Sequence, residues 1–200
     1  MEQPRPAWRG LRRELARKAF HLASVAVPAL AWFVPRPVML ALLLFATAIA
    51  VTVEVARRRV RAARYQFLRR TRPMLRGHER HRITGATYMA LSYTLAAYLF
   101  PLPAAAAAML YNALGDAAAA LVGKRYGRLR TSWGKSWEGF LAGLAVNVAV
   151  GLLIPGIPLV GALVGAITAS TLEFLPLPLD DNLRVTLGGG AGILLGSMLG

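Results

Sequence analysis

The chain has no cysteine, and only 9 of its 200 residues are aspartate or glutamate. The lack of cysteine excludes disulfide bonds, thiolate catalysis and zinc–thiolate sites. The sequence also has no internal repeat, whereas transporters of this size often have paired repeats. Hydrophobic residues make up 56% of the chain and the mean hydropathy is +0.47, and both values argue against a soluble domain.

Cations far outnumber acids. The chain has 24 Lys and Arg residues and a formal net charge of +15. In a soluble protein this excess would suggest a nucleic-acid partner. Here the cations fall between apolar runs, which is the pattern that the positive-inside rule describes for membrane proteins. We therefore expect a membrane protein without a nucleic-acid partner.

Apolar runs recur along the sequence, and several approach the ~20 residues that a helix needs to cross a bilayer. Prolines such as Pro35, Pro101 and Pro155 stand in short links, where they end or start a helix without removing an interior hydrogen bond. We predict an all-α, polytopic bundle of about seven transmembrane helices that forms a single membrane domain over residues 1–200. The predicted spans are 19–34, 38–56, 84–101, 103–123, 138–154, 157–175 and the glycine-rich 185–199.

The distribution of charge predicts the topology. If the N-terminus is cytoplasmic, every Lys and Arg except Arg36 lies on the cytoplasmic face, which supports seven spans. The cytoplasmic parts are then a basic amphipathic helix over 1–18, a basic and largely helical segment over 57–83, a nucleotide loop over 124–137 and an acidic loop over 176–184.

The segment 114–139 contains the main candidate site. Asp116 lies within an apolar helix, where a carboxylate is costly and is therefore a functional candidate. A loop rich in glycine and cations follows, and Lys135 and the N-terminus of the next helix favour phosphate. The pattern is not a P-loop, because Leu129 stands where that motif needs glycine. Membrane anchoring is the alternative for Lys124, and helix capping is the alternative for Glu138. The predicted nucleotide-binding residues are Asn112, Gly115, Gly123, Lys124, Gly127, Gly134, Lys135, Ser136, Glu138 and Gly139.

A second polar cluster combines Glu173 with Asp180, Asp181 and Asn182. Together with Asp116, the three residues 180–182 are predicted to hold Mg²⁺ on a triphosphate, because this hard cation prefers oxygen ligands. Asp116 and Glu173 are the predicted catalytic carboxylates, either of which would orient or deprotonate an acceptor hydroxyl. The alternative for the cluster is charge balance with neighbouring arginines.

Two further groups are predicted to contact the acceptor or to close the site. Glu14, Lys18 and His21 have helical spacing and form a stripe that meets the membrane at His21. Thr84 precedes the third predicted span. The alternatives are membrane anchoring by the basic stripe and N-capping of the helix by Thr84.

The segment 114–139 resembles the CTP-dependent lipid-alcohol kinases, a family that includes dolichol kinase, phytol kinase and CTP-dependent diacylglycerol kinases. The run from Thr171 to Asn182 is similar to the same region of bacterial members, and the chain resembles a minimal member of that type. The resemblance implies transfer of the γ-phosphoryl group of CTP to the hydroxyl of a polyprenol, phytol or diacylglycerol, with Mg²⁺ as cofactor. The residues alone do not distinguish CTP from ATP.

Phosphatidate cytidylyltransferase is more distantly similar and would make a CDP-lipid instead. A non-catalytic transporter or assembly subunit is the second alternative. The expected partners are CTP, a membrane lipid alcohol and the bilayer, and a homo-oligomer is left open. The expected location is the inner (plasma) membrane of a bacterial or archaeal cell, with the active site facing the cytoplasm.

Overall fold

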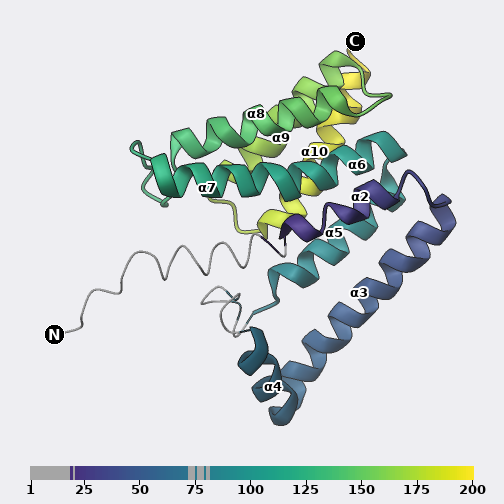
Figure 1. Ribbon diagram of the computed structural model, residues 1–200, viewed down its shortest axis with the longest axis vertical. Helices are drawn as coiled ribbons and strands as arrows, with labels where there is room; N and C mark the ends of the chain where they lie inside the picture. Colours follow the sequence, from purple (N-terminus) through teal and green to yellow (C-terminus); the bar gives the residue numbers. More distant parts are fainter. Residues whose placement is uncertain (1–18, 20, 72–74, 76–78, 80–81) are drawn as a thin grey trace.

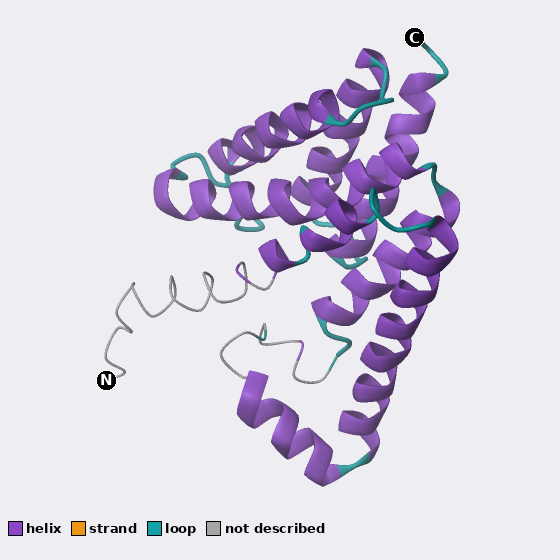
Figure 2. Cartoon of the chain, turned by 45° about the vertical axis from the view of Figure 1, so that its right-hand side comes forward, coloured by secondary structure: helices purple, strands orange, loops and turns teal. Residues whose placement is uncertain are grey.

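The computed structural model describes residues 19, 21–71, 75, 79 and 82–200, and these residues form a bundle of helices (Figure 1). Over this part of the chain no strand forms, and the only β-type pairing is an isolated bridge between Arg130 and Ser136. Figure 2 shows the same helices and loops from a second direction. The predicted all-α fold class is confirmed. Glu14 and Lys18, and the predicted helix over 1–18, lie outside the described residues.

The helices follow the predicted segments closely. Apart from the first, each predicted segment is found as helix, with ends shifted by no more than four residues. The fourth is one continuous helix in which a π-helical turn, η2, separates α6 from α7. The elements are α2 (Ala26–Leu30), α3 (Arg36–Arg59), α4 (Arg61–Thr71), α5 (Gly85–Leu99), α6 (Leu102–Leu110), η2 (Tyr111–Gly115), α7 (Asp116–Tyr126), α8 (Trp137–Leu153), α9 (Leu159–Phe174) and α10 (Asp181–Ser197).

The first predicted span is wrong as a continuous helix over 19–34. Pro28 has no backbone N–H, so it cannot donate the helical hydrogen bond to Ser24. Tighter bonds form instead, from Ser24 N to His21 O (3.1 Å) and from Val27 N to Ser24 O (3.0 Å). The α2 helix that follows is only five residues long.

The acidic loop is shorter than the predicted range 176–184. Asp180 is the N-cap of α10, and its side chain accepts a hydrogen bond from Asn182 N at 3.0 Å. An aspartate at this position satisfies a backbone N–H that the first turn would otherwise leave unpaired. Asp181, Asn182 and Arg184 therefore belong to the first turn of α10 rather than to a loop.

Two helices are long and apolar enough to cross a membrane: Arg36–Arg59, with a mean hydropathy of 2.4, and Leu102–Tyr126, with 1.4. In the most apolar window only 17% of the first is buried by the rest of the protein, against 61% of the second. The α3 helix thus exposes a broad apolar surface that includes Phe45, Ile49 and Val51. Such a surface marks a membrane or partner contact. Trp137–Leu153 and Leu159–Phe174 are apolar but shorter.

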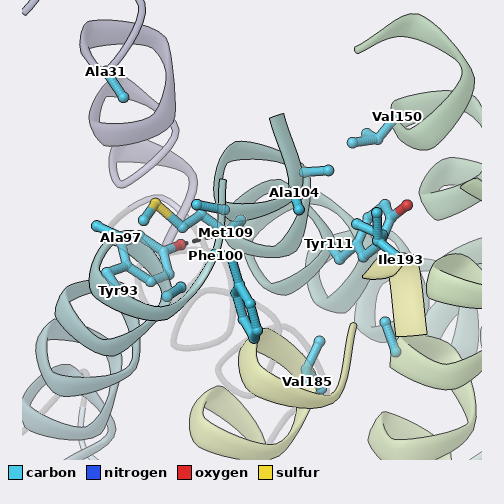
Figure 3. Packing of buried hydrophobic residues seen from close by; sticks show 14 of the residues in the cluster. Ala31, Tyr93, Ala97, Phe100, Ala104, Met109, Tyr111, Val150, Val185 and Ile193 are labelled. Atoms are coloured by element: carbon cyan, nitrogen blue, oxygen red, sulfur yellow. Dashed lines mark hydrogen bonds between the residues drawn. The ribbon is translucent and has the colours of Figure 1, made fainter. Parts of the chain in front are cut away.

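Small residues set the packing of the core. The alanines of α6, 104–108, are buried, and Figure 3 shows Ala104 among the larger side chains of the core. Tyr93 of α5 donates its hydroxyl hydrogen to the carbonyl of Met109 at 3.1 Å (Figure 3). Packing is most extensive between α9 and α10, where glycines on both helices allow close approach. In Figure 1 the α2–α3, α5–α6 and α8–α9 links lie on the right and the α7–α8 link on the left.

We predict that Gly192→Val destabilises the bundle. A Cβ at Gly192 would lie 2.9 Å from Thr168 Oγ1 and 3.1 Å from the Gly165 Cα, so α9 and α10 would have to separate. Overpacking of this kind costs about 1–3 kcal/mol of unfolding free energy. Thermal unfolding of the detergent-solubilised protein measures the loss. Ala191→Val is the matched control, because Ala191 is exposed; equal midpoints for the two variants would contradict the packing argument.

Candidate functional site

Asp116 lies at the first turn of α7, directly after the π-helical turn. It is only 9% exposed, and its Oδ2 is 3.2 Å from His21 Nε2. The same nitrogen lies 2.8 Å from the carbonyl oxygen of Asn112. A carbonyl can only accept, so His21 Nε2 carries a hydrogen and faces both oxygens. His21 therefore links the backbone of Asn112 to the side chain of Asp116. Both residues lie at the π-helical turn, a feature that is frequent at functional sites.

A cavity of about 400 Å³, here called the polar cavity, opens beside Asp116. Its walls come from η2, α7, α8, α9, the start of α10 and the α7–α8 loop. It contains most of the predicted site and has a size typical of small-molecule pockets. Its lining includes Gly115, Asp116, Gly123, Lys124, Arg130, Gly134, Lys135, Ser136, Gly139, Asn147, Ser170, Glu173 and Asp181.

An ion pair between Lys135 Nζ and Glu173 Oε1 joins the α7–α8 loop to α9 across this cavity. Burial alone would lower the pKa of Lys135, but the negative charges of Glu173, Asp181 and Asp116 raise it above its usual value. Lys135 is therefore a cation at neutral pH. It is 38% exposed, so it can also reach an anion in the cavity.

Two buried oxygens of the polar cavity have no hydrogen-bond partner among the described residues: Glu173 Oε2 and Asn147 Oδ1. Buried polar atoms are normally paired, so an unpaired acceptor suggests a ligand, an ion or water. Asp116 and Asp181 add carboxylates to the same lining. Over the described ranges, however, no three His, Cys, Asp or Glu side chains form a ready metal cage. The donor set fits Mg²⁺, which takes one or two carboxylates together with phosphate and water.

The predicted nucleotide loop is organised by its own side chains. Ser136 is the N-cap of α8 and accepts a hydrogen bond from Gly139 N at 3.1 Å, so α8 begins where predicted. Glu138 Oε1 accepts from the backbone N–H groups of Arg128 (2.9 Å) and Leu129 (3.1 Å). Glu138 therefore orders the loop and does not line the cavity.

The predicted glycines have mixed positions. Gly115, Gly123, Gly134 and Gly139 line the polar cavity, whereas Gly127 does not. Gly123 and Gly139 also let α7 and α8 approach closely, since a Cβ at Gly139 would lie 2.6 Å from the carbonyl oxygen of Ala119. Gly134 has φ +88°, a backbone conformation that favours glycine.

The predicted magnesium ligands separate into two groups. Asp116 and Asp181 line the cavity, and Asp181 also forms an ion pair with Arg184. Asp180 caps α10 and accepts from Asn182 Nδ2 at 2.8 Å. Asn182 in turn accepts from Asn112 Nδ2 at 3.2 Å, which joins η2 to α10. Neither Asp180 nor Asn182 lines the polar cavity.

A second cavity of about 370 Å³ lies next to the polar cavity, and we call it the apolar cavity. Among the described residues, Asp116 and Asp181 line both cavities. His21 and Thr84, which were predicted to contact the acceptor, line this second one. Its other lining residues are Ala50, Val53, Glu54, Phe67, Thr71, Leu75, Glu79, Gly85, Ala86, Thr87, Met89 and Asn182.

Thr84 is the N-cap of α5, which was the alternative given for it above, but its side chain makes no capping bond to the backbone. Its hydroxyl pairs with that of Thr87 at 3.1 Å. The N–H groups at this helix start are bound by two acids instead: Glu54 Oε2 accepts from Thr84 N at 3.3 Å, and Glu79 Oε1 from Gly85 N at 3.0 Å.

Several residues that line the polar cavity were not predicted as site residues. Arg130 lines the polar cavity and donates from Nη2 to the carbonyl of Gly123 at 2.9 Å. Asn147 of α8 donates to Ser170 Oγ of α9 at 2.9 Å, on the cavity wall. The sequence signal for this pair was that Asn147 and Ser170 are polar residues within two predicted membrane spans. No local pattern marks the helix faces that would bring them together.

The comparisons with known proteins give one distant relative. The chain is 27% identical over 184 residues to an uncharacterised protein of Rickettsia prowazekii (strain Madrid E). The similarity covers 87% of this chain and 90% of that protein, so it is not limited to a single motif. No protein-family model matches the chain, and no solved structure matches it.

We predict that Lys135→Met destabilises the fold by about 1–3 kcal/mol, because it leaves Glu173 buried without its cation. The cost is below that of a fully buried pair, since Lys135 is 38% exposed. Adding Glu173→Gln should restore most of the lost stability, because the remaining side chain is neutral. A double-mutant cycle of thermal unfolding measures the coupling, and strictly additive losses would contradict the pairing.

Proposed function

We propose that the protein is a membrane-bound kinase that transfers the γ-phosphoryl group of CTP to the hydroxyl of a lipid alcohol. The observation that carries this proposal is that Asp116 and Asp181 line both the polar cavity and the apolar cavity. A phosphoryl transfer between a soluble nucleotide and a lipid needs two such compartments with reactive groups where they meet.

The polar cavity would bind the nucleotide. Lys124, Arg130 and Lys135 all line it and supply positive charge for phosphate oxygens. Phosphoryl transfer asks the protein mainly for positioning and charge stabilisation, which three cations around one cavity can provide. The preference for CTP over ATP rests on the resemblance of 114–139 to the lipid-alcohol kinases.

Asp116 is the proposed catalytic base. The alcohol oxygen attacks the γ-phosphorus, the bond from that phosphorus to the β–γ bridging oxygen breaks, and CDP leaves with the bonding electrons. The hydroxyl proton passes to the Asp116 carboxylate, which His21 holds at 3.2 Å, and then to water. Glu173, the other candidate base, is already paired with Lys135. It lines the polar cavity but not the apolar cavity, where the alcohol would bind.

Mg²⁺, when bound, would offset the negative charge of the β- and γ-phosphates. Asp181 and Glu173 are the residues that would hold it, because both line the nucleotide side and Glu173 Oε2 lacks a hydrogen-bond partner among the described residues. Asp180 and Asn182 would act by fixing the start of α10, on which Asp181 stands.

The proposed topology keeps seven membrane segments, with the N-terminus and both loops of the site in the cytoplasm. Its support is the apolar surface of α3, the length of Leu102–Tyr126 and the separation of Arg36 from all other cations. The short α2 would then be only part of the first crossing, which the hydrogen-bonded turns on either side of it complete. The inner (plasma) membrane of a bacterial or archaeal cell is the proposed location.

Two rivals make different products. A phosphatidate cytidylyltransferase would join the lipid phosphate to the α-phosphorus of CTP and release pyrophosphate. A transporter or assembly subunit would need no chemistry at Asp116. We favour the kinase over the transporter because polar groups of the chain gather at the two cavities, whereas a transporter needs polar groups along a path through the bundle.

We predict that membranes containing the protein incorporate label from γ-labelled CTP into a lipid alcohol, and none from α-labelled CTP. Asp116→Asn should lower the rate by a factor of about 10² or more, because it removes the base. Arg36→Gln is the control that should retain the rate, because Arg36 starts α3 whereas the cavity residues Val53 and Glu54 lie near the end of that helix. Incorporation of the α label would establish the cytidylyltransferase instead, and unchanged activity in Asp116→Asn would refute the assigned base.

We also predict opposite sidedness for Arg36 and Ser132. The native chain has no cysteine, so single cysteines report without background. In intact cells a membrane-impermeant maleimide should label Arg36→Cys, whereas Ser132→Cys, in the α7–α8 loop, should react only after lysis. Both positions are exposed on the protein. Labelling of both from the outside would disprove the proposed topology.

A further inference from the structure

The two cavities that share Asp116 and Asp181 differ in their walls. The polar cavity is lined by three cations, whereas the described lining of the apolar cavity has none. The apolar cavity is formed instead by side chains such as Val53, Phe67 and Met89. We infer that the apolar cavity binds the hydroxyl end of a long-chain alcohol that has one hydroxyl and no ester groups. This inference rests on the proposed function and names its acceptor.

The polar groups of this cavity are already bound within the protein. Glu54 is paired with Arg57 and Arg58 and accepts from Thr84 N. Glu79 accepts from Gly85 N at 3.0 Å. These partners hold the acids in place, and they also occupy the groups that an elaborate polar headgroup would need.

The hydroxyls and the amide of the lining are bound as well. Thr84 pairs with Thr87 at 3.1 Å, and Thr71 donates to the carbonyl of Phe67 at 2.7 Å. Asn182 donates to Gly85 O at 3.2 Å. A diacylglycerol would bring two ester groups into this environment, and polar groups buried without partners cost free energy. A single hydroxyl needs only one acceptor, which Asp116 supplies at the shared wall.

The cavity is continuous with the exposed apolar surface of α3. Val53 lines the cavity and is also 43% exposed, so it belongs to both. Ile49, four residues before Val53 and on the same face of the helix, extends this apolar surface, whereas Val51 faces the opposite side of α3. The cavity holds only the end of a long chain, at about 370 Å³. The rest of the tail would lie along α3, in the lipid that the helix is suited to contact.

The test uses the full-length protein in lipid nanodiscs and a photoreactive C15 isoprenoid alcohol that carries a diazirine. Ala50→Trp would fill the apolar cavity, whereas Val51→Trp, one residue further on, is exposed and outside the lining. We expect Ala50→Trp to reduce labelling about tenfold or more, equivalent to about 1.4 kcal/mol, and Val51→Trp to leave it nearly unchanged. Excess unlabelled diacylglycerol should compete poorly.

Ala86→Trp, on the α5 side of the cavity, is the second variant should Ala50→Trp fail to fold. Equal labelling of the Ala50→Trp and Val51→Trp proteins would overturn the assigned cavity. Effective competition by diacylglycerol would overturn the preference for a single hydroxyl.

Transfer of the γ label separates this inference from the proposed function. If the alcohol labels the cavity, Ala50→Trp blocks it and no phosphoryl transfer occurs, the kinase proposal fails and the binding site stands. If transfer to the C15 alcohol proceeds in Ala50→Trp with an unchanged KM for the alcohol, the kinase stands and the binding site is overturned. The expected result is a raised KM for the alcohol with little change in the KM for CTP.

Discussion

The burial of Asp116 is the constraint on which the site depends. A carboxylate that is 9% exposed between apolar helices must find partners, and His21 supplies one at 3.2 Å. The same ring nitrogen lies 2.8 Å from the carbonyl of Asn112, whose side chain donates to Asn182. The segment before α2, the π-helical turn and α10 therefore meet around one charge. The acid thus fixes the place where the two cavities come together.

Small residues pack closely along much of the bundle, whereas the two cavities described above lie near Asp116. Along α9 and α10 glycines bring the backbones together, and the alanines of α6 fill the centre without large side chains. Interiors packed in this way leave few voids. Near Asp116 the chain departs from that pattern. There the loop 127–136 replaces a packed helix face on one cavity and residues such as Leu75 and Glu79 line the other, and side chains such as Lys135 and Glu54 form the walls.

The helices could be predicted because their signals are local: apolar runs, and prolines in the links. Pro28, which lies inside α2, was a signal as well, because it cannot donate the helical hydrogen bond to Ser24, where the first segment is interrupted. The Asp180 cap was readable as the start of α10 but was interpreted as part of a loop. The site was predicted only in part. Lys135 with Glu173, and His21 with Asp116, are pairs from distant parts of the chain, and only tertiary packing brings each together. The two-cavity arrangement has no local pattern at all.

More than half of the acidic residues of the chain line one of the two cavities. Glu54, Glu79, Asp116, Glu173 and Asp181 all line one of the two cavities, although the chain has only nine acids and a net charge of +15. Glu54 and Glu79 have a structural role, because they accept hydrogen bonds from the backbone N–H groups at the start of α5. Asp116, Asp181 and Glu173 line the same cavity, and each has a partner: His21, Arg184 and Lys135 in turn. Like charges around one cavity repel one another, and these pairs together with Lys124 and Arg130 of the lining offset that repulsion. A triphosphate adds further negative charge to this balanced set, so it would enter more readily together with a divalent cation that the carboxylates can share.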